Sequence, residues 1–296
     1  MDMRRNTQQD NRGSIIMALL SLYFIWGSTY LAIRVALEGF PPFMMAGIRF
    51  LLTGFGLFLA LRARGVENPG HREWLSASVV GGLLLLGGNG GVVYAEQTVS
   101  SGMAALSVAA VPLWTVLFAG VWRKWPNRLE WAGIITGFAG VALLNSDGEL
   151  MASHQGAIAL IIAAISWAFG SAWSYRLPMP QGLMSGAVQM ISGGAFLIIA
   201  GFFANETLDT MPSLRAVLAV LYLMIFGSLI AFSAYIYLLK NVRPALATSY
   251  AYVNPVVAVF LGISLAGEKL TMNGTIAMVV IIAGVIMVAL GQKEKH

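Results

Sequence analysis

Residues 24–34 read FIWGSTYLAIR, and the triplet Trp26-Gly27-Ser28 inside this stretch is matched by Phe169-Gly170-Ser171, 143 positions later. Further matches follow in the same order along both halves of the chain. They are Met44-Met45-Ala46-Gly47 with Leu183-Met184-Ser185-Gly186, Tyr94 with Tyr237, Pro112 with Pro255, and Ala139-Gly140-Val141 with Ala283-Gly284-Val285. An ordered series of this kind indicates an internal repeat. We therefore expect two copies of one unit, in residues 1–146 and 147–296.

The composition is that of an integral membrane protein. Hydrophobic residues make up 58% of the chain and charged residues 10%, and the mean hydropathy is +0.76. This leaves too little polar surface to cover a soluble globule. A helix needs about 20 apolar residues to cross about 30 Å of hydrocarbon. Apolar stretches of about this length number ten, five in each copy: 15–37, 43–62, 75–97, 103–121, 129–145, 156–176, 183–203, 215–238, 246–265 and 273–291.

These stretches are continuous apolar runs, not the short segments of alternating polarity that a membrane barrel requires. An odd number of spans in each copy means that the second copy enters the membrane with the opposite orientation. The sequence therefore predicts an all-α integral membrane fold of ten transmembrane helices, arranged as two inverted five-helix repeats.

Basic residues fall mainly on one side of this arrangement. Arg215 and Lys269 lie in loops of the opposite side, while Arg34 lies at a boundary and Arg49 within the second span. The other fourteen are Arg4, Arg5, Arg12, Arg62, Arg64, Arg72, Arg123, Lys124, Arg128, Arg176, Lys240, Arg243, Lys293 and Lys295. Because loops rich in Lys and Arg remain in the cytoplasm, both termini are predicted to be cytoplasmic.

Several kinds of chemistry are disfavoured by the residues present. The absence of cysteine rules out disulfides, thiolate catalysis and cysteine-ligated metal. The three histidines, His71, His154 and His296, lie in loops or the tail, and the acidic residues are scattered. We therefore expect no metal, no cofactor and no catalytic residue. A membrane-embedded enzyme, the weaker alternative, usually gathers acids or histidines to hold metal or move protons.

Arg49 is the charged residue that most needs an explanation, because a charge inside the membrane costs a few kcal/mol or more. Two interpretations are open. Its side chain could reach toward Glu38 or Glu96 and form a structural ion pair, or it could attract the carboxylate of a substrate. Glu96 lies near the end of the third span and could be interfacial. It is also the best available acid for proton coupling.

Neutral polar and aromatic residues occupy the middle of the membrane in both copies. Aromatic walls with a few hydroxyl and amide groups suit a pocket for an amphipathic small molecule, although they also suit helix packing. The predicted substrate-binding residues are Trp26, Ser28, Tyr30, Arg49, Asn89, Tyr94, Trp167, Ser171, Tyr237, Tyr250 and Asn254. Pro112 and Pro255 are predicted to kink their helices at matching points and to mark the interface between the repeats.

Three motifs resemble a known family: FIWGSTYLAIR at 24–34, PPFMMAGIRF at 41–50 and ALATSYAYVNPVVAVFLGISLAGE at 245–268. In these motifs the chain resembles EamA-type members of the drug/metabolite transporter superfamily, in particular bacterial inner-membrane exporters. The resemblance implies ten helices in two inverted repeats and a central cavity lined by helices one, three, four, six, eight and nine. The family pattern of proline, glycine and glutamate is kept as Pro255, Gly262 and Glu268, but the first half has Trp125 where the glutamate would align.

The resemblance implies a multi-pass transporter of the bacterial inner membrane that exports amino acids, aromatic or small and neutral, and related amphipathic metabolites. Alternating access is the expected mechanism. Because no carboxylate lies at the centre of a span, facilitated export is predicted over proton coupling, with a proton-coupled drug/metabolite antiporter as the alternative. The expected partners are a small-molecule substrate and the lipid bilayer, with no nucleic acid, and the protein is expected to be a monomer or homodimer. Gly133 and Gly137 allow close helix contact, either within the bundle or between subunits.

Overall fold

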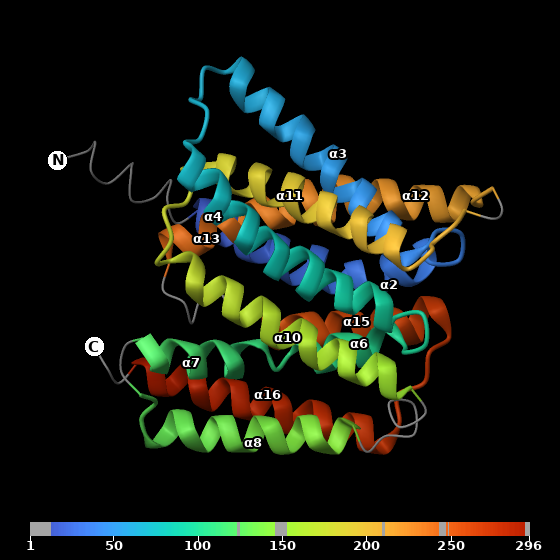
Figure 1. The fold of residues 1–296 in the computed structure, drawn as a ribbon. Coiled ribbons are helices and arrows are strands. Elements are labelled where there is room, and N and C mark those ends of the chain that lie inside the picture. The colour runs from blue at the N-terminus through green and yellow to red at the C-terminus, as the bar shows by residue number, and fades with distance from the viewer. Residues whose placement is uncertain are drawn as a thin grey trace.

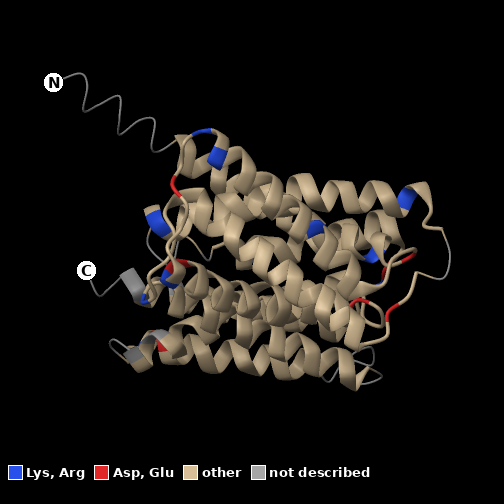
Figure 2. Cartoon of the chain, turned by 45° about the horizontal axis from the view of Figure 1, so that its top comes forward, with Lys and Arg blue, Asp and Glu red and all other residues tan. Residues whose placement is uncertain are grey.

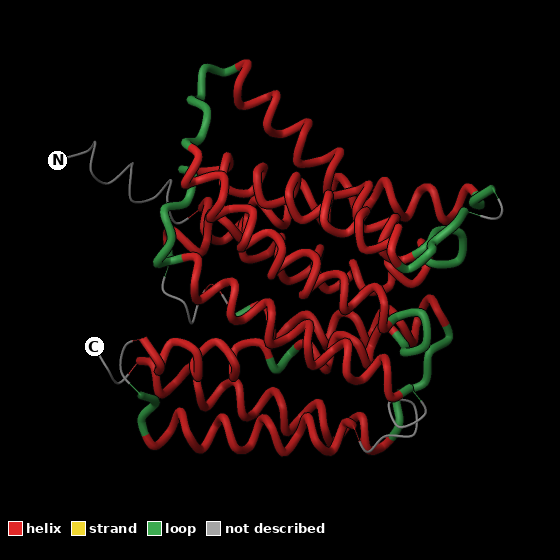
Figure 3. Tube along the Cα trace, viewed as in Figure 1, coloured by secondary structure: helices red, strands yellow, loops and turns green. Residues whose placement is uncertain are grey.

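The computed structural model describes residues 13–122, 125–145, 153–208, 211–242, 247 and 249–293. In this part of the chain the structure is helical, and Figures 1 and 3 show helices joined by short loops without a strand. Seven of the helices are long and apolar enough to cross a membrane, and two shorter apolar helices are Val253–Ala266 and Met272–Val288. The prediction of an all-helical membrane protein is therefore confirmed.

The helices follow the predicted apolar stretches wherever the structure describes them, with ends that differ by a few residues. The seven membrane-length helices run Gly13–Ala36, Pro42–Ala63 (α3), His71–Ala95, Ser101–Phe118, His154–Ser174 (α10), Gly182–Phe203 (α11) and Leu214–Asn241. The remaining helices are α8 (Arg128–Asn145), α15 (Tyr250–Ala266) and α16 (Met272–Lys293). The count of ten spans stays a prediction, and the predicted boundary between the repeats, at 146 and 147, lies outside the described residues.

Three membrane-length helices contain a π-helical segment near the middle of the span. These segments are η1 (Ser21–Trp26), which continues as α2 (Gly27–Ala36); η2 (Gly82–Gly90), between α4 (His71–Gly81) and α5 (Gly91–Ala95); and η3 (Leu223–Ala231), between α12 (Leu214–Tyr222) and α13 (Phe232–Asn241). A π-helical turn widens the backbone and shifts the direction of the side chains that follow, and such turns are common at functional sites.

The two prolines act differently on their helices. The fourth membrane-length helix is divided into α6 (Ser101–Val108) and α7 (Val111–Trp122), and Pro112 is the second residue of α7. Proline is well tolerated at this position because the first amides of a helix have no partner within it. In contrast, Pro255 lies inside α15, which continues to Ala266.

The described chain begins and ends at the same end of the bundle, which we call the terminal end (Figure 1). The opposite end, called the distal end, holds the ends of α2, α5, α11 and α15. Figure 2 shows that Lys and Arg gather mainly at the terminal end, where Arg62, Arg64, Arg72, Arg128, Arg176 and Lys240 close or begin helices. Arg34, Arg215 and Lys269 lie at the distal end.

The outward faces of the helices are strongly apolar. Phe260 is 66% exposed and Ile135 is 67% exposed, and many other Leu, Ile, Val and Phe side chains are similarly uncovered. An exposed apolar surface of this extent is unfavourable in water but suits hydrocarbon. The distribution of side chains therefore agrees with a bundle whose outside faces lipid.

Helices from the two halves of the chain pack closely against each other through glycine. α3 lies along α11, and α8 lies along α16. A Cβ atom added at Gly194 of α11 would lie 2.6 Å from the backbone nitrogen of Leu51 in α3, and one at Gly284 of α16 would lie 2.5 Å from that of Gly137 in α8. Gly133 and Gly137 therefore serve packing within the bundle, which was one of the two interpretations of these glycines.

At the distal end, two carboxylates from the second half of the chain cap the N-termini of helices in the first half. The Glu268 carboxylate accepts hydrogen bonds from the Ser101 amide at 2.9 Å, the Ser101 hydroxyl at 2.9 Å and the Gly102 amide at 3.2 Å. Glu206 accepts from the amides of Phe43 at 3.0 Å and Met44 at 2.8 Å. A negative charge is stabilising at a helix N-terminus because the first amides lack partners and the helix dipole is positive there.

The close packing of α8 on α16 through glycine gives the first testable prediction. Gly284→Ala should lower the thermal midpoint of the purified protein in detergent, because a methyl group would meet the α8 backbone and overpacking costs about 1–3 kcal/mol. The matched control is Gly56→Ala in α3, since no atom lies within 4 Å of the added methyl group. This control should keep or raise the midpoint, because alanine favours a helix over glycine. Equal midpoints for the two variants would contradict the close packing of α8 on α16.

Candidate functional site

A cavity lies in the middle of the bundle and is lined by helices from both halves of the chain. Its lining residues come from the first, second and third membrane-length helices, from α6, α10 and α15, and from the η3–α13 region. They are Trp26, Thr29, Tyr30, Ile33, Arg49, Phe50, Leu85, Gly88, Asn89, Val92, Val108, Ala163, Trp167, Gly227, Phe232, Tyr250 and Asn254. Arg49 is the one charged residue among the described residues that line it. The wall is otherwise apolar and aromatic, with a few neutral polar groups.

Trp26 is the centre of an aromatic cluster at one side of the cavity. Its ring centroid lies 5.5 Å from that of Trp167, 5.2 Å from Tyr235 and 5.1 Å from Tyr250. The contacts with Trp167 and Tyr250 are edge-to-face, which is a favourable arrangement for aromatic rings. The four rings come from η1, α10, α13 and α15, so the cluster joins both halves of the chain.

The π-helical segments contribute backbone to the same region. The indole Nε1 of Trp26 in η1 donates to the carbonyl oxygen of Gly227 in η3 at 3.2 Å. In η2, a Cβ atom on Gly88 would lie 2.7 Å from the Trp167 ring. Glycine at position 88 is therefore needed for α10 to bring Trp167 to the cavity.

Arg49 reaches the cavity from α3 and is only 3% exposed. Its Nη2 donates to the Asn89 Oδ1 atom at 3.1 Å, and its guanidinium carbon lies 4.3 Å from the centre of the Phe50 ring. The Nε and Nη1 atoms are buried without a hydrogen-bond acceptor. A buried guanidinium with free donors has the geometry to bind a carboxylate through two parallel hydrogen bonds.

Asn254 fixes two elements of the cavity wall. Its amide nitrogen is directed toward η1. This nitrogen lies 3.0 Å from the carbonyl oxygen of Leu22, 3.1 Å from that of Tyr23 and 3.2 Å from that of Tyr250. The side chain is 4% exposed. Asn254 therefore ties the wide turn of η1 to α15, one residue before the proline that interrupts the backbone hydrogen bonds of α15.

The structure brings most of the predicted substrate-binding residues to this cavity. Those that line it are Trp26, Tyr30, Arg49, Asn89, Trp167, Tyr250 and Asn254. Ser28, Tyr94, Ser171 and Tyr237 do not belong to its lining. Ser28 binds the Tyr222 hydroxyl at 2.6 Å, Tyr94 donates to Gln155 at 3.1 Å, and Ser171 binds the Tyr235 hydroxyl at 2.7 Å.

Tyr235, which the sequence analysis did not select, is fully buried against Trp26. The predicted residue is Tyr237, which is the counterpart of Tyr94 in the repeat. The intervening π-helical segment η3 changes the direction of the following side chains, so Tyr235 faces the aromatic cluster. The polarity of the sequence alone carries no signal for such a segment.

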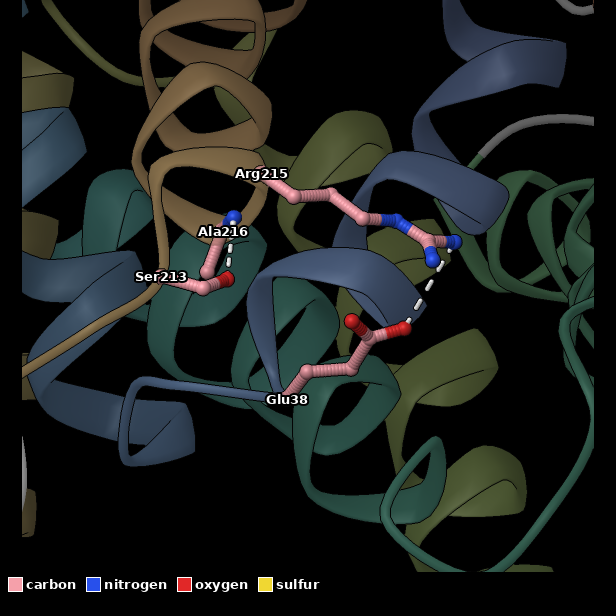
Figure 4. Close-up of polar contacts among 4 residues, drawn as sticks. All are labelled: Glu38, Ser213, Arg215 and Ala216. Carbon is pink, nitrogen blue, oxygen red and sulfur yellow. Dashed lines mark hydrogen bonds and ion pairs between the residues drawn. The ribbon is translucent and has the colours of Figure 1, made fainter.

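The first of the two interpretations of Arg49, an ion pair with Glu38 or Glu96, is not present in the described structure. Glu38 instead pairs with Arg215 at 3.6 Å, and both side chains are exposed. Figure 4 shows this pair together with the Ser213 cap of α12. Within the described part of the chain, no carboxylate oxygen lies within 4.0 Å of Arg49. Glu96 lies at the end of α5, and its side chain is fully buried by protein.

Comparisons with known proteins give one consistent result. The model of the EamA-like transporter family matches residues 13–146 and matches again at residues 154–290. The chain is 51% identical over 276 residues to a protein of Escherichia coli (strain K12) described as uncharacterized inner membrane transporter YedA, which covers 93% of this chain and 90% of that protein.

More distant relatives cover nearly the same length. A protein of Bacillus subtilis (strain 168) described as uncharacterized transporter YoaV is 23% identical over 279 residues, covering 92% of this chain and 96% of that protein. A solved protein crystal structure has a TM-score of 0.70 at 23% identity and covers 94% of this chain and 98% of that one. At this identity the likeness concerns the fold alone.

The role of Asn254 gives the second prediction. Asn254→Leu should lower the thermal midpoint, because it leaves carbonyl oxygens of η1 and α15 without a donor at a cost of about 1–3 kcal/mol. The control is Asn241→Leu, which removes a single bond to the Tyr237 carbonyl oxygen at the exposed end of α13. A fall in the midpoint for Asn241→Leu as large as that for Asn254→Leu would show that the amide of Asn254 has no special structural role.

Proposed function

The chain is a membrane transporter of the EamA-like transporter family, and from this premise we propose that it exports amino acids and related small amphipathic metabolites. The substrate class consists of aromatic or small neutral amino acids. Export proceeds by alternating access, in which the central cavity opens to each side of the bacterial inner membrane in turn. The relatives named above are described only as transporters, so the substrate rests on the cavity of this chain.

The observation that carries the proposal is the free hydrogen-bonding capacity of Arg49. A buried guanidinium costs several kcal/mol unless an anion or acceptor compensates it. Asn89 supplies one acceptor, and two nitrogens remain without one. A substrate carboxylate entering the cavity would provide both the negative charge and two acceptor oxygens.

The aromatic cluster supports the proposal that the substrate has an apolar part next to its carboxylate. Trp26, Trp167 and Tyr250 present ring surfaces to the same cavity that Arg49 lines. Rings of this kind bury the apolar part of a ligand, while the guanidinium fixes its polar end. An amphipathic molecule with one carboxylate therefore fits the chemistry of the wall.

The proposed architecture is ten transmembrane helices in two inverted five-helix repeats, with both termini in the cytoplasm. It is supported by the two separate matches of the family model, at 13–146 and 154–290, and by the packing of α3 on α11 and of α8 on α16, which are counterparts in the repeat. The gathering of Lys and Arg at the terminal end supports its cytoplasmic orientation. Carriers built from inverted repeats bind substrate where the halves meet.

Transport is proposed to follow the substrate gradient. No acid and no histidine is found among the described residues that line the cavity, so substrate binding involves no group that titrates near neutral pH. The same lining disfavours a membrane-embedded enzyme, which would place acids or histidines next to its substrate. The protein acts in the lipid bilayer on a small molecule, as a monomer or a homodimer.

Proton-coupled antiport is the second candidate, and one observation favours it. Glu96 is fully buried at the distal end, and both of its carboxylate oxygens lack a hydrogen-bond donor. A carboxyl group in such a place is a candidate proton carrier if alternating access exposes it to each side. The experiment below separates the two modes of transport.

The test is uptake into liposomes that contain the purified protein. Radiolabelled L-phenylalanine and L-alanine should enter down their gradients with the pH gradient collapsed. Arg49→Gln should reduce this flux at least about tenfold, because loss of a charge-assisted hydrogen bond costs about 1.5–3 kcal/mol and 1.4 kcal/mol is a factor of ten.

The matched control is Arg215→Gln, since Arg215 has a 64% exposed side chain at the distal end. It should keep the wild-type flux. Unchanged flux in a stable Arg49→Gln protein would contradict the carboxylate site. Uphill accumulation driven by an imposed pH gradient would instead establish proton coupling.

A further inference from the structure

Two buried side chains of opposite charge, Arg49 and Glu96, have unused hydrogen-bonding capacity. Arg49 has two nitrogens without an acceptor, and Glu96 has two oxygens without a donor. The residues are 3% and 0% exposed. Each group alone would be costly in this environment, because removal of an unpaired charge from water is not compensated. The two groups form no ion pair in the described structure.

The other charged groups around Glu96 are already engaged. Arg34 donates from Nη1 to the backbone carbonyl oxygens of Glu96 at 2.8 Å and Val99 at 3.3 Å, and its side chain reaches the surface. Glu268 already accepts three hydrogen bonds, from the Ser101 amide, the Ser101 hydroxyl and the Gly102 amide. Tyr30, the remaining titratable neighbour, is one of the residues that line the cavity. Arg49 and Glu96 are therefore the two groups of this cluster with open positions.

The helix that carries Glu96 also provides a path between the two groups. Asn89, which holds Arg49 at 3.1 Å, and Glu96 are seven residues apart on this helix, which corresponds to about two turns or 10 Å. Val92 lies between them and lines the cavity with Arg49. The long side chain of Arg49 can move along this face from the Asn89 amide toward the Glu96 carboxylate.

We propose that Glu96 is the internal counter-ion of Arg49 during the return of the empty carrier: as the cavity closes without a carboxylate substrate, the guanidinium leaves the Asn89 amide oxygen and pairs with Glu96. The inference rests on the proposed carboxylate site. It explains how a carrier with such a site can return without substrate. A carrier that runs downhill must change conformation empty once in each cycle, and an unpaired Arg49 would make that step costly. With Glu96 as its partner, the empty protein can return. Glu96 therefore makes net transport possible, while exchange of one substrate for another does not require it.

The test compares net flux with exchange in the same liposomes. In Glu96→Gln, net efflux of preloaded L-phenylalanine should fall at least about tenfold, while exchange of internal for external L-phenylalanine should stay within about twofold of the wild type. Glu38→Gln is the matched control, since Glu38 is an exposed carboxylate at the same end and pairs with Arg215. It should keep both rates. Equal loss of both rates in Glu96→Gln, or loss of neither, would overturn the proposal.

Two further measurements keep the test decisive. A pH-sensitive dye inside the liposomes should record no proton movement during wild-type net efflux, and proton movement in step with the substrate would overturn the proposal in favour of proton coupling. If Glu96→Gln does not fold, Glu96→Asp keeps the charge with a shorter reach and should lower net efflux more than exchange; an equal effect on both contradicts the proposal. Absence of wild-type exchange with L-phenylalanine and L-alanine would instead refute the proposed function, and this inference with it.

Discussion

A guanidinium group in the centre of a membrane protein must be balanced by an anion or by hydrogen-bond acceptors, because an unpaired charge there costs several kcal/mol. This constraint links the observations on the cavity. Arg49 is held by one amide oxygen and one aromatic face, and it keeps two donors free. A site of this kind is stable enough to fold and still gains energy from a carboxylate ligand. The same constraint requires a partner when the ligand has left, and Glu96 is placed to act as one.

The cavity that surrounds Arg49 depends on departures from regular α-helical geometry. Three helices contain a π-helical segment near mid-span, and a fourth is broken between Val108 and Val111. These irregular turns bring Trp26, Gly88 and Gly227 to the cavity wall. Backbone carbonyl oxygens of these turns accept hydrogen bonds from neighbouring side chains. Trp26 donates to the Gly227 carbonyl oxygen, and Asn254 contacts carbonyl oxygens of η1. Irregular backbone inside a membrane is tolerated where it lines a cavity or is satisfied by protein.

Around this irregular centre the bundle is held by closely packed pairs of helices. Glycine allows α3 to approach α11 and α8 to approach α16, and the carboxylates of Glu206 and Glu268 cap helices of the opposite half. The sequence predicted the helical class and the helix positions well, because long apolar runs have few alternatives in a membrane. The motif glutamate at 268 was recognised from its resemblance, but its role as a helix cap depends on a contact between residues far apart in the chain. The sequence could not reveal the π-helical segments, and it could not show that Tyr235 and not Tyr237 faces Trp26. The hydrogen bond from Arg49 to Asn89 was not predicted either, because charge and depth do not determine which side chains meet.

The central claim is that Arg49 recognises a carboxylate inside an aromatic cavity, and calorimetric titration of the purified protein tests it directly. The ligands are L-phenylalanine, 3-phenylpropionate and phenethylamine, which share one ring and differ in their charged groups. Our account predicts heat of binding for the two ligands that carry a carboxylate, none for phenethylamine, and loss of the carboxylate signal in Arg49→Gln. Binding of phenethylamine as tight as that of L-phenylalanine, or unchanged binding of L-phenylalanine to a folded Arg49→Gln protein, would contradict it.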